Sequence, residues 1–290
     1  MSQEQDVVDL VQALENAYQH FAKQSEAVLA IKVGGRRFVG IRSDQSSRLD
    51  LAHLRRTICR TRGPQSSSAK ILQVVGDSGT AFDSATIQSA QQALARCIEH
   101  DVFLEYGSTS FEHDANWLVQ DYLSTRPETA VRAVANVVNE SLKVLQSSQW
   151  TASERVDVFV MLYNKDGTPT RFGEDTWVSD GIMSGDLADR MLCFEGGPQA
   201  FHQCVNALLA GIEVLVMTDL RPTSVEQRFS AARLLLTYST TEDGVESDQP
   251  VKACLDSYPP KTEEQLLAVH KDLGRLREAS TVVARLIRLM

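Results

Sequence analysis

The chain of 290 residues has no run of 18 apolar residues, so no membrane-spanning helix is expected. Its five cysteines form no Cys-x-x-Cys pair and no metal-ligand spacing, which favours reduced thiols, a cytoplasmic protein and no metal site. The N-terminus, Met-Ser-Gln-Glu-Gln-Asp, is acidic and unlike a signal peptide. Positive charge is scarce, and the formal net charge of −9 argues against a general partner for nucleic acid.

Two fingerprints of nucleotide enzymes are also missing. The chain has no Gly-x-Gly-x-x-Gly motif and no P-loop lysine, so neither NAD chemistry nor Walker-type ATP hydrolysis is expected, and no cofactor. Gly76-Asp77-Ser78-Gly79 has the letters of the trypsin-like nucleophile motif. Those proteases are all-β, whereas this tetrapeptide lies between a strand pattern and a helix pattern, which excludes that interpretation.

The most informative stretch runs from Met191 to Met217. It predicts a buried strand, a turn at Gly196-Gly197-Pro198, an amphipathic helix over Gln199–Ala210 and a second buried strand, Val214–Met217. Such a turn lies where a helix N-terminus presents free N–H groups, and its glycines let a ligand approach the backbone. The usual ligand of such a turn is an anion, most often a phosphate group. A tight turn without a ligand is the alternative.

Strand patterns alternate with helix patterns over residues 66–245, which predicts one α/β domain. Strands are expected over Lys70–Val75, Val102–Glu105, Val156–Tyr163, Leu192–Glu195 and Val214–Met217. Helices are expected over Ser84–Ile98, Asp114–Leu123, Ala130–Leu145, Gln199–Ala210 and Val225–Thr237. This alternation predicts a Rossmann-like parallel sheet with helices on both faces. Residues 164–186 form a long loop of the kind that is usually functional or mobile.

Residues 1–65 predict an N-terminal helix-hairpin appendage. A helix is expected over residues 6–23, and two β-rich runs, Ala27–Val33 and Arg36–Arg42, are joined by Gly34-Gly35 as a hairpin. A basic helix is expected over Leu49–Arg62. Between Arg36 and Lys70 there are nine Lys or Arg against two Asp. This basic segment is interpreted as a solvated face or contact surface, as a nucleic-acid patch, or as the source of an arginine in a phosphate site.

Residues 246–290 predict a linker and a long C-terminal helix, preceded by an acidic exposed loop over Thr240–Gln249. Thr262 with Gln265 resembles a capping box. From Leu266 to Met290, apolar residues recur at heptad a and d spacing, with Ser280 interrupting. The helix either packs on its own domain or forms a homo-oligomer interface.

Ligands of parallel sheets bind beyond the carboxyl ends of the strands, near the point where the strand order reverses. Three turns are expected to gather there and supply the phosphate-binding residues: Gly76, Asp77, Ser78, Gly79 and Thr80; Gly107, Ser108 and Thr109; and Gly196, Gly197, Pro198, Gln199 and Ala200. Glu105 and Glu195 end strands beside these turns, as ribose ligands, acid/base groups or solvated strand ends. His113 and His202 lie near the turns and are interpreted as surface or cap residues.

The order of these motifs resembles the LOG/SLOG superfamily, also called lysine-decarboxylase-like. The resemblance rests on Val74-Val-Gly-Asp-Ser-Gly79, Leu104-Glu-Tyr-Gly107 and Leu192-Cys-Phe-Glu-Gly-Gly-Pro198 and covers roughly residues 70–220. That group includes the cytokinin-activating phosphoribohydrolases and the nucleotide-sensing cytosolic domains of melastatin-type TRP channels. The Glu-Gly-Gly-Pro turn is most similar to the channel domains.

The phosphoribohydrolases carry Pro-Gly-Gly-x-Gly-Thr-x-x-Glu, and this chain departs from it. Gln199-Ala200 replaces Gly-Thr, and Gln203 replaces the catalytic Glu; Arg190 is the candidate for the family's catalytic arginine. Because a glutamine cannot act as a general base, the resemblance implies binding or sensing of a phosphorylated nucleoside derivative, ADP-ribose-like or a nucleotide. The alternatives are an N-glycosidase acting on nucleoside 5′-monophosphates through Glu105 or Glu195, and a non-catalytic assembly protein.

Overall fold

The structure is a computed structural model of a mixed α/β chain. It describes residues 3–24, 26–42, 50–59, 70–76, 82–98, 102–107, 115–125, 132–137, 156–166, 188–218, 229–240, 248–279 and 286–288. The strands are β1 (Val28–Val33), β2 (Arg36–Arg42), β3 (Lys70–Gly76), β4 (Val102–Gly107), β5 (Arg132–Val137), β6 (Val156–Tyr163), β7 (Arg190–Phe194), β8 (Glu213–Met217) and β9 (Leu286–Arg288). The helices are α1 (Gln3–Phe21), α2 (Leu51–Cys59), α3 (Ser84–Cys97), α4 (Ala115–Thr125), α7 (Pro198–Leu209), α8 (Ala231–Thr240), α9 (Asp248–Ser257) and α10 (Glu263–Glu278).

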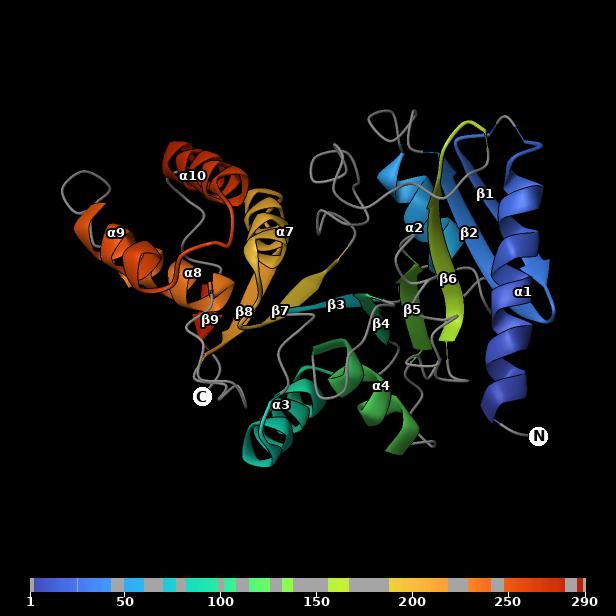
Figure 1. The fold of residues 1–290 in the computed structure, drawn as a ribbon, viewed down its shortest axis with the longest axis horizontal. Coiled ribbons are helices and arrows are strands. Elements are labelled where there is room, and N and C mark those ends of the chain that lie inside the picture. Colours follow the sequence, from blue (N-terminus) through green and yellow to red (C-terminus); the bar gives the residue numbers. More distant parts are fainter. Residues whose placement is uncertain are drawn as a thin grey trace.

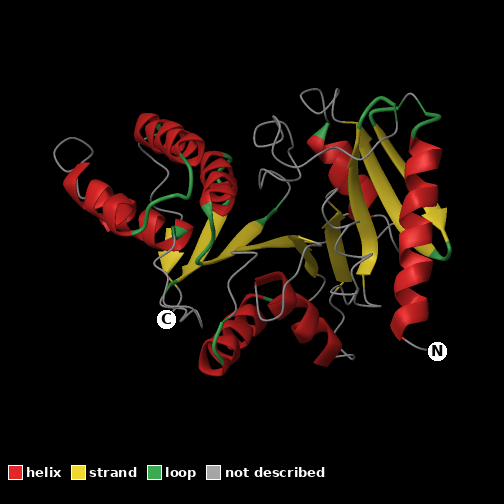
Figure 2. Cartoon of the chain, in the orientation of Figure 1, coloured by secondary structure: helices red, strands yellow, loops and turns green. Residues whose placement is uncertain are grey.

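Within the described residues, nine strands form one sheet in the order β1-β2-β6-β5-β4-β3-β7-β8-β9. Figure 2 shows the strands in yellow with the helices in red around them. Only the β1–β2 pair is antiparallel, and every other neighbouring pair in that order is parallel. The α/β prediction is therefore confirmed. From β3 the chain builds outward through β4, β5 and β6, and then returns to the other side of β3 with β7 and β8. The strand order thus reverses between β3 and β7, which defines the switch point of the sheet.

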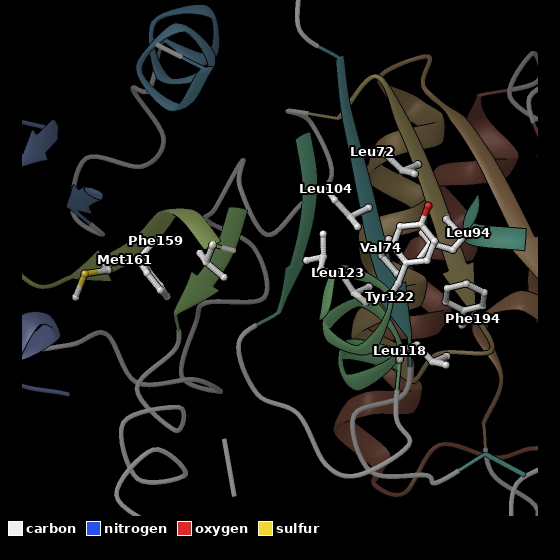
Figure 3. Packing of buried hydrophobic residues seen from close by; sticks show 14 of the residues in the cluster. Leu72, Val74, Leu94, Leu104, Leu118, Tyr122, Leu123, Phe159, Met161 and Phe194 are labelled. Carbon is white, nitrogen blue, oxygen red and sulfur yellow. The ribbon is translucent and has the colours of Figure 1, made fainter. Parts of the chain in front are cut away.

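The strands β3, β7 and β8 are buried on both faces, because they carry apolar, buried side chains at successive positions. In β7, Leu192 and Phe194 belong to a core cluster with α1, α3 and α4, whereas Met191 and Cys193 belong to a cluster with α7, α8, α9 and α10. Figure 1 shows α3 and α4 on one side of β3 and β7 and α7 to α10 on the other. Figure 3 shows the first cluster, where Tyr122 from α4 lies beside strand residues. Helix α2 adds a third, smaller cluster over β2 and β6.

The predicted hairpin of β1 and β2 is confirmed, with positive φ angles of 55° at Gly34 and 80° at Gly35. Residues 1–65 were expected as an appendage, yet β2 pairs in parallel with β6 and so extends the main sheet. Helix α1 covers this extension. A Cβ at Gly40 would lie 2.7 Å from the Phe21 ring, and that ring stacks on Tyr163 with centroids 5.2 Å apart. The N-terminal segment therefore shares the core of the sheet.

One predicted helix is wrong. The sequence pattern indicated a helix over residues 130–145, but residues 132–137 form the parallel strand β5 between β4 and β6. Residues 130–131 and 138–145, the rest of the predicted helix, lie outside the described residues. This valine-rich segment has apolar residues at both helical and strand spacing, and its pairing with β4 and β6 decided the outcome.

The prediction of one long helix reaching Met290 is also wrong. Helix α10 ends at Glu278, and residues 286–288 form β9, which pairs with β8. Helix α9 begins at Asp248, inside the range predicted as an acidic loop. The Thr262 cap is confirmed, since its hydroxyl accepts from Gln265 N at 3.2 Å. The heptad residues Val269, Leu273 and Leu276 are buried in the cluster with α7, so this seam packs within the chain.

Candidate functional site

Described residues from the three predicted turns lie at one edge of the sheet. Gly76 ends β3 and pairs with Phe194 in β7, while Gly107 ends the neighbouring strand β4. Since these strands are parallel, their carboxyl ends meet beside the switch point. Residues 77–80, 108 and 109 lie outside the described residues. The structure therefore brings Gly76, Gly107 and the turn after β7 together.

The turn after β7 requires a glycine at its central position, Gly196. Glu195 and Gly196 have positive φ angles of 55° and 84°. A Cβ at Gly196 would lie 2.6 Å from the Cβ of Ala200 and 3.3 Å from that of Ala231. The absent side chain lets the start of α7 and the start of α8 approach the turn together.

Gly197, the next residue, is open. It is the N-cap of α7, with φ −80° and ψ −175°, and within the described part of the chain no side chain forms a hydrogen bond that caps the helix there. A Cβ at Gly197 would meet nothing within 4 Å, and the first turn of α7 has no acidic residue. Pro198, at the first helical position, has no N–H to satisfy. The positive end of the α7 dipole thus faces an accessible backbone at the switch point, which suits an anion.

The turn also caps a second helix, α8, through its backbone. The carbonyl oxygen of Gly196 accepts from Ala231 N, and that of Glu195 accepts from Ala232 N, both at 2.8 Å. These donors belong to the first turn of α8, where N–H groups have no partner inside the helix. The Glu195–Gly197 turn therefore lies between the N-termini of α7 and α8.

The carboxylate of Glu195 points to the same helix start. The Ser230 hydroxyl donates to Glu195 Oε2, and Arg233 Nε lies 3.8 Å from that oxygen. Ser230 Oγ in turn accepts from Arg233 N at 3.1 Å. The Glu195 side chain is only 14% exposed. A carboxylate at a helix N-terminus is stabilising, so these contacts give Glu195 a structural role in joining the turn to α8.

Replacing Glu195 by alanine is expected to lower the free energy of unfolding by about 2 kcal/mol, because a charged hydrogen bond and a helix-cap charge are lost together. Urea denaturation measures the change. Glu195→Gly is the matched control: it loses the same carboxylate but relieves the positive φ, so it should be about 1 kcal/mol more stable than Glu195→Ala. Equal stabilities of the two variants would contradict the left-handed turn.

The structure does not bring Arg190 to this turn. Arg190 begins β7, and its Nε lies 2.6 Å from Oε2 of Glu213, its partner in β8. Glu195 lies five positions further along the chain, which corresponds to roughly 16 Å of extended strand. Glu105 lies in β4, two positions before the end of the strand, and pairs in register with the buried Gln73 of β3. Its backbone is therefore within the sheet near the switch point.

Gln203 and His202 lie on α7. Gln203, which stands where the resemblance to the phosphoribohydrolases would put a catalytic Glu, is buried with 8% exposure. His202 was interpreted as a surface or cap residue, but its Nδ1 lies 2.7 Å from Oδ2 of Asp272 on α10. Asn206 Nδ2 lies 3.1 Å from His202 Nε2, and Arg275 donates to Asp272 Oδ1 at 2.9 Å. This network fixes α10 on α7. The i, i+3 spacing of Asp272 and Arg275 was its only signal in the sequence.

Asp272→Ala is expected to cost about 2 kcal/mol of folding stability, because the buried carboxylate contacts side chains of two helices, His202 of α7 and Arg275 of α10. Arg275→Ala is the control, and should cost less than about 1 kcal/mol since the Arg275 side chain is 36% exposed. Chemical denaturation of both variants is the measurement. A larger loss for Arg275→Ala would show that the contact between α7 and α10 does not depend on His202 and Asp272.

The cysteines have packing roles. All five thiols are free, and only Cys254 is partly exposed. Cys193, under the turn, is fully buried; a hydrogen bond with the Cys204 thiol and burial raise the pKa of Cys193 well above its usual value. A neutral buried thiol is a poor nucleophile, so thiol chemistry is not supported at this turn.

In the part of the chain that the structure describes, no group of three or more His, Cys, Asp or Glu is placed to hold a metal ion, and no helix is long and apolar enough to cross a membrane. A scan against models of known protein families finds no match, and a search of curated proteins finds no significant match. The geometry of the Glu195–Gly197 turn is therefore the feature that points to a function.

Proposed function

We propose that this protein binds a phosphorylated nucleoside derivative, an ADP-ribose-like molecule or a nucleotide, at the carboxyl edge of a Rossmann-like sheet. The observation that carries the proposal is the open N-terminus of α7 at Gly197, next to the switch point between β3 and β7. Open α/β sheets bind ligands at this place, and helix N-termini bind phosphate there.

The surroundings of the turn add support. Gly76, at the end of β3, lies against the first residue of α4, since its missing Cβ would be 2.3 Å from the Cβ of Ala115. The first turn of α7 has no acidic residue. Two helices thus begin on opposite faces of the sheet at one edge. The resemblance of the Glu-Gly-Gly-Pro turn to the nucleotide-sensing channel domains agrees with this proposal.

Binding is favoured over cleavage of an N-glycosidic bond. Glu195, one candidate for acid/base work, is engaged by Ser230 and Arg233 at the start of α8. Gln203 has no carboxylate with which to stabilise positive charge on a ribosyl transition state. The proposed role is therefore recognition of the ligand without turnover.

The test is thermal melting against a panel of nucleotides and nucleotide sugars, followed by chromatography of the same mixtures. A ligand at 100 times its dissociation constant should add about 2.7 kcal/mol of stability, which raises the melting temperature. An upward shift with intact ligand supports the proposal. Release of free base would instead indicate a glycosidase, and no shift with any compound would favour an assembly protein.

Gly197→Asp locates the site. An aspartate is a good N-cap, so the variant alone should be at least as stable as the wild type. Its carboxylate occupies the anion position, so the ligand-induced shift should be lost. Gly274→Asp is the control: Gly274 lies in α10, where a Cβ also meets nothing within 4 Å, and this variant should keep the shift. An unchanged shift in Gly197→Asp would place the ligand elsewhere.

A further inference from the structure

Arg233 is a cation held beside the Glu195–Gly197 turn. It is the third residue of α8, and its Nε lies 3.8 Å from Glu195 Oε2. Its Nη1 lies 3.4 Å from the Tyr258 hydroxyl, and the guanidinium carbon is 5.1 Å from the centre of the Tyr258 ring. The guanidinium is therefore held between the turn and the residue that follows α9.

An anion at this turn needs such a cation. The Glu195 carboxylate lies one residue from Gly196, and like charges at this separation repel each other. The α8 dipole and the Ser230 hydroxyl stabilise Glu195 itself. A guanidinium beside the carboxylate would offset the repulsion and could also donate to the ligand.

The distance between Arg233 and Glu195 is longer than the distances in two other ion pairs of the described residues. The distance of 3.8 Å exceeds the 2.6 Å between Arg190 and Glu213 and the 2.9 Å between Arg275 and Asp272. A charge-assisted hydrogen bond measures about 2.8 Å. The Arg233 side chain is 34% exposed, so it remains accessible to solvent while it contacts Glu195.

Tyr258 sets the orientation of the guanidinium. A guanidinium that stacks on an aromatic ring keeps its plane fixed, and its N–H edge can then form two parallel bonds to a phosphate. We propose that Arg233, positioned by Tyr258, donates to the phosphate of the ligand bound at the start of α7. This assignment rests on the proposed function and names the side chain that gives the site its preference for anions.

Titration calorimetry with ADP-ribose is the test, with each nucleotide that shifts the melting temperature as a further probe. Arg233→Gln should weaken ADP-ribose binding at least about tenfold, because a charged hydrogen bond is lost. Arg233→Lys keeps the charge without the planar fork and should give an intermediate loss. Arg275→Gln, which changes another partly exposed arginine away from the turn, should bind within about twofold of the wild type.

A double variant separates direct contact from neutralisation of Glu195. If Arg233 only offsets the carboxylate, Glu195→Gln combined with Arg233→Gln should restore wild-type affinity. If Arg233 donates to the phosphate, the double variant should stay at least about tenfold weaker than Glu195→Gln alone. Circular dichroism and melting confirm that each variant is folded.

The outcomes distinguish the two proposals. Wild-type protein that binds neither ADP-ribose nor any nucleotide overturns both. Wild-type binding that is unchanged in Arg233→Gln, or restored in the double variant, overturns the role of Arg233 and leaves the proposed function standing.

Discussion

Gly196→Ala is expected to lower the free energy of unfolding by about 4 kcal/mol, the largest effect of any single substitution considered for the turn. The φ angle of 84° places an alanine in the left-handed region, which costs about 1–2 kcal/mol. The added Cβ would also lie 2.6 Å from the Cβ of Ala200 and 3.3 Å from that of Ala231. Both atoms belong to helix starts, so relief requires α7 or α8 to move. Urea denaturation followed by circular dichroism measures the loss.

Gly197→Ala is the matched control, one residue along the same turn. Its φ of −80° suits any residue, and its Cβ would meet nothing within 4 Å. Alanine is a poorer N-cap than glycine, so a loss of about 0.5 kcal/mol is expected. Similar losses for Gly196→Ala and Gly197→Ala would contradict the turn geometry, since nothing but that geometry separates the two glycines.

Gly76→Ala is expected to cost about 3 kcal/mol, because the end of β3 has no room for a side chain. The added Cβ would lie 2.3 Å from the Cβ of Ala115 and 2.9 Å from the carbonyl oxygen of Phe194. The first atom is at the start of α4 and the second is the backbone of β7, so neither can rotate away. Thermal and urea denaturation of the variant are the measurements.

Ala115→Gly provides the rescue. Alone, it should cost less than about 1 kcal/mol, because it lies at the first position of α4. Combined with Gly76→Ala, it removes the closer contact and leaves the one with Phe194, so the pair should be at least about 1 kcal/mol more stable than the sum of the single losses predicts. Strict additivity would show that Gly76 does not contact the start of α4.

The sequence correctly predicted the elements that begin or end at a turn or helix-capping residue. Gly34-Gly35 marked the hairpin, and Thr262 marked the start of α10, because turns and caps depend on residues close in the chain. Strand β5 was missed since its valines fit either period, and its identity depends on β4 and β6 on either side. The heptad pattern predicted a helix that continues beyond Glu278, because the apolar residues of the short strand β9 happen to follow the same spacing.

The edge of the sheet that carries the turns was predictable, whereas the partners of the turn were not. A Gly-Gly-Pro turn between two strand patterns indicates where a ligand site belongs in an α/β fold. The contact of Glu195 with Ser230 joins residues 35 positions apart, and that of His202 with Asp272 joins residues 70 positions apart. Such contacts depend on how α8 and α10 pack, which no local pattern encodes.

Backbone amide spectra recorded during an ADP-ribose titration test the central claim most directly, because they report on the N–H groups that the account assigns to the ligand. With ¹⁵N-labelled protein, the amides of Gly196, Gly197, Gln199 and Ala200 should shift progressively and saturate together. The Gly197→Asp variant should lose these shifts while its spectrum stays that of a folded protein. If these four amides do not move, whether the rest of the spectrum is unchanged or shifts elsewhere, the start of α7 is not the binding site.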